Sequence, residues 1–475
     1  MLLPTSQTTA PKLITISEHI WRKQASTHSQ RIRHLLQPGL TLLNNDINSG
    51  KNKQRRRQQH YVDDWTALDP VNPIYNFLIE YYGLKGATGP RRLARWAPDP
   101  KLLWGQRHGN DDCMLSSSSV AISLAAMKAS HGLGGILLEN ATIDDLGGTL
   151  HMRGGVPVPM IDSEGDPDTD TEEQQLHGVL YNPAVFYNRH LPLNNNEDKE
   201  RKLQLLKTIA PFQWYTSILR QTLSSDPVLH CYGLHEWAMQ YHPEGADPPP
   251  SAKYQSSLNL RVSRQVINDT VERKGVRCTH VDALRFFAPA AGPLNHHGAS
   301  LQRMDQLRLE QKGCVHAHMD LLKIGLKLQG FIDSELMGDI LEIALEARRL
   351  DVEASPYDAT GYGVGIVPIE TNEGRKVYRE RQIGLMKRAE PVRQRLLDAY
   401  EVFMKIAFDE SLLVGGSGEE FVGKRTSSSV DDEKNVVTTK SGSNDNGDGP
   451  YVAPERLALA EPGGLPWRKN LIEKS

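Results

Sequence analysis

Long helical segments in the second half of the chain constrain the fold more than any other feature. Residues 315–329, 333–350 and 374–407 repeat apolar side chains at helical spacing. The last segment is long and polar on one face, and we expect a break or kink at Pro391, because proline removes a backbone donor. These segments predict a mainly α fold class, a helical domain with a few short strands.

Shorter segments add to this prediction. Apolar residues recur at helical spacing in residues 73–82, where a proline stands in the first turn, and again in 203–223. Residues 114–130 carry serines followed by apolar residues, which indicates a capped, largely buried helix. Residues 258–262 alternate apolar and polar side chains and predict a short strand, and Ser263 is placed to cap a following helix.

Polar stretches divide the chain. The 475 residues have a mean hydropathy of −0.48, so some stretches add length without adding core. We expect an N-terminal segment and basic linker at 1–60, a single mainly helical domain at 61–408, a disordered insert near 161–175, disorder at 409–450 and a C-terminal tail at 451–475. The acidic insert lacks the Gly and Glu positions of a calcium-binding loop, which favours disorder there.

Charge and cysteine content exclude several classes of protein. With 55 basic and 58 acidic residues, the chain is no dedicated polyanion binder, although one basic groove stays open. The four cysteines form no C-x-x-C pair, which argues against a zinc ribbon or a disulfide framework and favours a reducing, intracellular compartment. No run of 18 apolar residues could span a membrane, so we expect a soluble protein. The sequence does not decide between the nucleus, the cytoplasm and an organelle as the location of the protein.

Three short segments combine histidines and carboxylates with apolar flanks, an arrangement that buries and tunes functional side chains. They cover residues 233–239, 278–287 and 313–322. The candidate catalytic residues are His235, Glu236, His280, Asp282, His316 and Asp320. If the third segment is helical, His316 and Asp320 share a face. If the second is extended, His280 and Asp282 point to the same side.

Residues near these segments are candidates for substrate binding. They are aromatic or charged: Trp237, Tyr241, Arg285, Phe286, Lys323, Tyr357 and Asp358. Asp351, Tyr357 and Asp358 could rim the site, but a helix stop with local capping explains that segment equally well. Glu236 next to Trp237 could be a desolvated carboxyl with a raised pKa, suited to donating a proton.

The alternative is a purely structural role, in which these residues are buried polar pairs that hydrogen-bond to one another across helices. We favour a functional site, because burying so many ionisable groups lowers the stability of the fold and a function would explain why they are retained. The motifs H-E-x-x-H and G-x-S-x-G and a phosphate-binding glycine loop are all missing from the sequence.

Several strings in the chain carry a family resemblance. They are Asn76-Phe77-Leu78 with Tyr81-Tyr82, Arg95-Trp96-Ala97-Pro98, Leu234 to Met239, His280 to Phe287, His316 with Met319-Asp320-Leu321, and Ala354-Ser355-Pro356-Tyr357-Asp358. Over Trp21 to Arg31, Pro73 to Pro98 and most of 228–410, the chain resembles an uncharacterised family labelled 3-methyladenine DNA glycosylase. Asn72 stands where that family is expected to have a histidine, and no helix-hairpin-helix signature is visible.

The resemblance implies a DNA-repair hydrolase, an N-glycosylase that removes alkylated bases without a cofactor. In this hypothesis a flipped base stacks near Trp237 or Phe286, and Asp282 or Glu236 supports the attack of a water on the glycosidic carbon. His280 and His316 would orient that water. Three arginines would contact the phosphates of DNA: Arg91, Arg92 and Arg95.

The alternative hypothesis is a metal-dependent helical enzyme that acts on a small molecule. The six catalytic candidates supply nitrogen and oxygen ligands for iron, manganese or zinc, although the sequence does not assign individual ligands. A third interpretation is a binding module without catalysis. The oligomeric state stays open.

Overall fold

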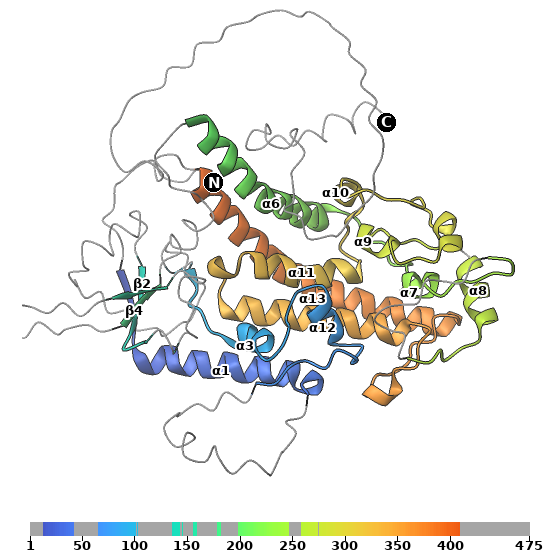
Figure 1. Ribbon diagram of the computed structural model, residues 1–475, viewed down its shortest axis with the longest axis horizontal. Helices are drawn as coiled ribbons and strands as arrows, with labels where there is room; N and C mark the ends of the chain where they lie inside the picture. Colours follow the sequence, from blue (N-terminus) through green and yellow to red (C-terminus); the bar gives the residue numbers. More distant parts are fainter. Residues whose placement is uncertain are drawn as a thin grey trace, which may run out of the picture.

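The computed structural model describes residues 13–41, 65–100, 102, 135–142, 145, 155–158, 178–181, 198–246, 258–273 and 275–408. Helices dominate this part of the chain, and the predicted mainly α fold class is confirmed (Figure 1). The segments at 114–130, 161–175, 409–450 and 451–475 lie outside the described residues.

Packed helices form the centre of the molecule. They are α11 (Val315–Lys327), α12 (Ser334–Ala354) and α13 (Asn372–Phe408), with α6 (Asp198–Ser224) packed against α13. Figure 1 shows α11, α12 and α13 running side by side along the long axis. All four helices confirm segments that the sequence predicted.

The predicted break at Pro391 is not observed. Helix α13 continues through this proline. Pro391 lies on the exposed side of the helix, where water can satisfy the carbonyl that a proline leaves without its usual donor.

The middle helix, α12, is buried on nearly every side. Its N-terminus is capped by Asp333, whose side chain accepts a hydrogen bond of 2.7 Å from the Leu336 backbone N–H. Its last two turns carry Arg348, Asp351 and Glu353, all of them buried. Buried charges are costly unless they are paired, so this end of α12 marks a place that needs an explanation.

Shorter helices surround this centre. They are α1 (Glu18–Leu36), α2 (Asn76–Glu80), α3 (Thr88–Ala94), α7 (Leu234–Ala238), α8 (Arg264–Glu272), α9 (Val281–Leu284) and α10 (Asp305–Leu309), with 3-10 turns η1 (Gln37–Gly39), η5 (Pro289–Leu294), η6 (Gln329–Phe331) and η7 (Thr360–Tyr362). The predicted helix at 73–82 is shorter than expected, because the Asn72 side chain accepts from the Ile74 N–H and holds a turn before α2. The predicted cap is confirmed: Ser263 accepts from the Val266 N–H at the start of α8.

A small sheet lies at the opposite end of the molecule from α7 (Figure 1). Its strands β1 (Leu13–Ile16), β2 (Gly135–Glu139), β3 (Gly155–Val158) and β4 (Gly178–Tyr181) follow the order β1-β2-β4-β3, with β1 parallel to β2 and the other pairs antiparallel. The sheet packs with Trp21 of α1 in a core of its own.

The strand predicted at 258–262 does not form. Only an isolated bridge joins Leu260 to Tyr357. Within the described part of the chain, no helix is long and apolar enough to cross a membrane.

Candidate functional site

The end of α12 meets α7 and the start of α11, and the predicted histidines gather there. Gly233 precedes α7 with a φ of 67°, a left-handed conformation that favours glycine. A Cβ at this position would lie 3.5 Å from the Ala354 Cβ and 3.7 Å from Asp351 Oδ1. The left-handed conformation of Gly233 leads the chain into α7, and the residue lies beside the end of α12, close to Asp351.

The three histidines form a row of rings. His316, in the first turn of α11, lies between the other two, with ring centroids 4.3 Å from His235 and 4.6 Å from His280. The rings of His280 and His316 are nearly parallel, with an angle of 9° between their planes. The sequence prediction that these three segments converge is therefore met by the structure at the histidines.

The conditional prediction for the second segment is not met. His280 precedes α9, and Asp282 lies inside that helix, so the two residues are not neighbours on an extended strand. His280 instead faces Asp320 of α11, with 3.9 Å between His280 Nε2 and Asp320 Oδ2.

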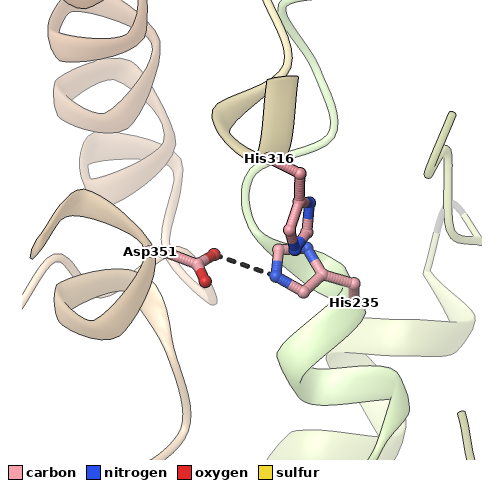
Figure 2. Close-up of side chains that lie close together, drawn as sticks. All are labelled: His235, His316 and Asp351. Carbon is pink, nitrogen blue, oxygen red and sulfur yellow. Dashed lines mark ion pairs between the residues drawn. The ribbon is translucent and has the colours of Figure 1, made fainter. Parts of the chain in front are cut away.

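A first set of side chains consists of His235, His316 and Asp351 (Figure 2), with one ligand atom from each lying within 4.8 Å of the others. Asp351 Oδ1 lies 2.9 Å from His235 Nε2 in a buried ion pair. Both atoms are buried, and neither has a partner in good hydrogen-bond geometry among the described residues.

The two charged partners of this set shift each other's pKa. Burial is the largest influence and lowers the pKa of His235, but the charge and contact of Asp351 together with the charge of Glu236 outweigh it, so the net shift is upward. Burial is also the largest influence on Asp351 and raises its pKa, but the charge and contact of His235 together with the charges of His316 and Arg348 outweigh it, so this pKa falls well below its ordinary value. Burial, together with the neighbouring rings, lowers the pKa of His316 far below the usual range, so that imidazole is neutral.

Arg348, one turn before Asp351 on α12, organises this first set. Its Nη1 donates to Asp351 Oδ2 at 3.0 Å and to Glu236 Oε1 at 3.2 Å, and its Nε donates to the Pro73 carbonyl at 3.0 Å. One oxygen of Asp351 is thus fixed by Arg348 and the other faces the histidines. Glu236 pairs with this guanidinium, which differs from the isolated desolvated acid that the sequence suggested.

A second set lies on the other side of the row and consists of His280, Glu310 and Cys314. One ligand atom from each lies within 4.8 Å of the others, and all three residues are buried. Glu310 Oε2 accepts a hydrogen bond of 2.8 Å from Gln306 Nε2. Burial raises the pKa of the Glu310 carboxyl and of the Cys314 thiol.

No protein-family model, curated protein or solved structure matches this chain. The two sets of side chains therefore carry the functional argument by themselves.

Four of the predicted substrate-binding residues have structural partners instead. Trp237 is fully buried, and its Nε1 donates to the Ala354 carbonyl at 2.8 Å. The Tyr241 hydroxyl donates to Glu272 at 2.7 Å, and the Tyr357 hydroxyl accepts from Gln240 Nε2 at 3.0 Å. Asp358 is exposed and accepts from the Thr360 backbone N–H and hydroxyl, as in a local turn cap.

The remaining candidates near the histidines are half-buried or exposed. Arg285 is exposed and places its guanidinium 4.8 Å over the ring of Phe286, which meets Tyr81 edge-on at 6.4 Å. Asp282 and Asp320 are half-buried, and their charges add to the effect of burial in raising the pKa of Tyr82. Lys323, also half-buried, follows Asp320 by three residues on α11.

The three predicted phosphate-binding arginines lie elsewhere. Arg91 and Arg92 are on α3 and Arg95 follows it, and α3 packs against α1. Arg92 Nε donates to Gln329 Oε1 at 2.9 Å, and burial lowers the pKa of Arg92. In Figure 1, α3 is separated from α7 along the long axis.

Sequence reasoning missed Arg348 and Glu310, and it gave Asp351 only a rim position. A signal existed for Arg348, since an arginine three residues before an aspartate on the same helix can form an ion pair with it. Glu310 lies in the connection between α10 and α11, and nothing local distinguishes it from a surface glutamate.

Proposed function

We propose that this chain is a metal-dependent enzyme acting on a small molecule, with His235, His316 and Asp351 as the metal ligands. The observation that carries the proposal is the 2.9 Å approach of His235 Nε2 to Asp351 Oδ1, two buried atoms without hydrogen-bond geometry. Two ligands about 2 Å from the same cation lie roughly 3 Å apart, which suits this approach.

The donor types support a divalent transition metal. Two imidazoles and one carboxylate form the ligand set of non-haem iron enzymes and of many zinc hydrolases, and both leave coordination positions open for water or substrate. When bound at such a site, a divalent ion lowers the pKa of a coordinated water and polarises a substrate oxygen. Iron, manganese and zinc all fit the donor set.

Residues around the ligands complete this centre. Arg348 holds one oxygen of Asp351, so the carboxylate keeps a single orientation toward the histidines. With Glu236, two carboxylates and one guanidinium leave one net negative charge in a buried volume. A divalent cation changes that charge to one net positive charge, which favours an anionic ligand or an ionised water.

The burial of the ligands supports a small substrate. Asp351 and His235 are 0% and 3% exposed, and His316 is only partly exposed. The half-buried Asp320, whose carboxylate lies 3.9 Å from His280, and the half-buried Phe286 are the candidate substrate contacts. Hydrolysis fits this arrangement, because Asp320 lies close enough to the histidines to accept a proton from an attacking water.

The hypothesis of base excision from DNA stays a prediction. The residue expected to stack on the base, Trp237, is buried with its N–H bonded, and the expected phosphate contacts lie near α3. Release of free base from methylated duplex DNA, with salt-dependent binding of that DNA, is the assay that would support it.

The metal content of the purified protein tests the proposal. We expect stoichiometric iron, manganese or zinc by elemental analysis, and we expect His316→Ala and Asp351→Asn to lower the content by one equivalent. His242→Ala is the matched control, because among the described residues that imidazole bonds only to the Ala246 carbonyl of its own loop. Metal content that is unchanged in both ligand variants would overturn the proposal.

A further inference from the structure

We infer that His280, Glu310 and Cys314 form a second cation site, of the zinc class, next to the first. The inference rests on the proposed function, since it makes the first site one half of a two-metal centre. It assigns a role to residues that no part of the base-excision hypothesis uses, namely Glu310 and Cys314.

The geometry of the three side chains is that of ligands rather than of a hydrogen-bonded cluster. A ring nitrogen, a carboxylate oxygen and a sulfur lie within 4.8 Å of one another. Among the described residues, no hydrogen bond joins any two of these side chains, and the buried Nδ1 of His280 has no partner at all. An unpartnered buried imidazole nitrogen is costly unless something else occupies it.

The neighbouring charges also suit a divalent cation. Glu310, an ionised Cys314 and the nearby Asp320 carry three negative charges, and the buried Arg393 next to them carries one positive charge. The remainder is two negative charges, which one divalent cation neutralises.

The donor atoms distinguish the second site from the first. Thiolate sulfur favours zinc over manganese, magnesium or calcium, whereas the first set has only nitrogen and oxygen donors. Cys314 immediately precedes α11, and His316 is in its first turn, so one short segment supplies a ligand to each site.

The two proposed cation sites lie next to each other, which bears on the reaction they could catalyse. The rings of His280 and His316 stack with 4.6 Å between their centroids, so one residue of each set contacts the other set directly. Neighbouring cation sites are the arrangement in which phosphatases and nucleases hold both the attacking and the leaving oxygen. The inference therefore narrows the proposed reaction to hydrolysis.

Titration of the metal-free full chain with Co²⁺ tests the inference. We expect two equivalents to bind, one of them with the near-ultraviolet charge-transfer absorption of a cobalt–thiolate bond. Cys314→Ser should abolish that absorption and reduce the stoichiometry from two to one. Cys278→Ser, which replaces another buried cysteine outside the ligand set, should retain both.

Two further variants keep the outcomes separate. Asp351→Asn should lose one equivalent but retain the charge-transfer absorption, so failure of the first site is distinguishable from failure of the second. If Cys314→Ser does not fold, Glu310→Gln decides the matter, with an expected loss of at least about tenfold in affinity for the thiolate-bound equivalent. One equivalent without thiolate absorption in the wild-type chain overturns the inference, as does a Glu310→Gln variant of unchanged affinity.

Discussion

The two side-chain sets on either side of the histidine row have similar members but different support. In the first, the carboxylate of Asp351 receives a charged hydrogen bond from Arg348 on the same helix. In the second, the carboxylate of Glu310 receives a neutral one from Gln306. Charge-assisted hydrogen bonds are roughly twice as strong as neutral ones, so the first set is organised before any ligand arrives. The second set depends more on its ligand for order.

The two sets also differ in how firmly the elements that carry their ligands are held in the fold. Asp351 belongs to α12, a long helix that is buried over most of its length. Glu310 and Cys314 belong to the connection between α10 and α11, and neither lies within a helix. Ligands on a packed helix keep their geometry when the ion leaves, whereas ligands on a connection can relax. The comparison predicts a structural role for Arg348 and a tuning role for Gln306.

The largest expected effect is that of Arg348→Met. The substitution leaves Asp351 and Glu236 buried without their positive partner, and breaking a buried pair in this way costs about 3–5 kcal/mol of unfolding free energy. Urea denaturation in the presence of a chelator measures this loss independently of metal. The control is Arg388→Met, which removes an exposed ion pair with Glu346 and should cost at most about 1 kcal/mol. Equal losses in the two variants would contradict the organising role of Arg348.

Removal of metal from the wild-type chain should have the next largest effect. A cation that binds only the folded chain stabilises it by about 2.7 kcal/mol per site at a hundredfold excess over its Kd. Thermal unfolding with zinc and then with excess chelator should therefore show a clear fall in Tm. Asp351→Asn and Cys314→Ser should each respond less than the wild type, because each retains one site. A wild-type Tm that does not change when the chelator is added would argue against both sites.

The smallest expected effect is that of Gln306→Ala. Loss of an outer-shell hydrogen bond typically lowers metal affinity by about tenfold or more, and only the second site should be affected. Competition with a chromophoric chelator measures the two affinities separately. Gln394→Ala is the matched control, because its amide donates to Asp398 with the same four-residue spacing on the exposed surface. A comparable loss at the first site would show that the two sets are not separately supported.

Much of the fold was predictable from local pattern. The segments at 315–329, 333–350 and 374–407 correspond closely to α11, α12 and α13, because a long apolar stripe at helical spacing has few other ways to be buried. The strand at 258–262 was predicted wrongly. A short alternating run needs a partner strand, and here only one bridge, between Leu260 and Tyr357, is available.

The site was predictable in its histidines but not in their partners. His280 and Asp282 were expected to point to the same side if their segment is extended, and Glu236 was considered as a desolvated acid next to Trp237. In the structure His235 lies against Asp351 and His280 against His316. Adjacent residues on a helix point in different directions, so a histidine finds its acid on another element.

The sequence by itself determined the helical class, the boundaries of the long helices and the three histidines that matter, since each of these follows from residue type and local spacing. Only the tertiary structure decided which acids meet those imidazoles, that Arg348 holds Asp351, and that Glu310 and Cys314 join His280. The physical reason is that contacts between separate elements depend on how the helices pack, and the order of residues along one segment carries little of that information.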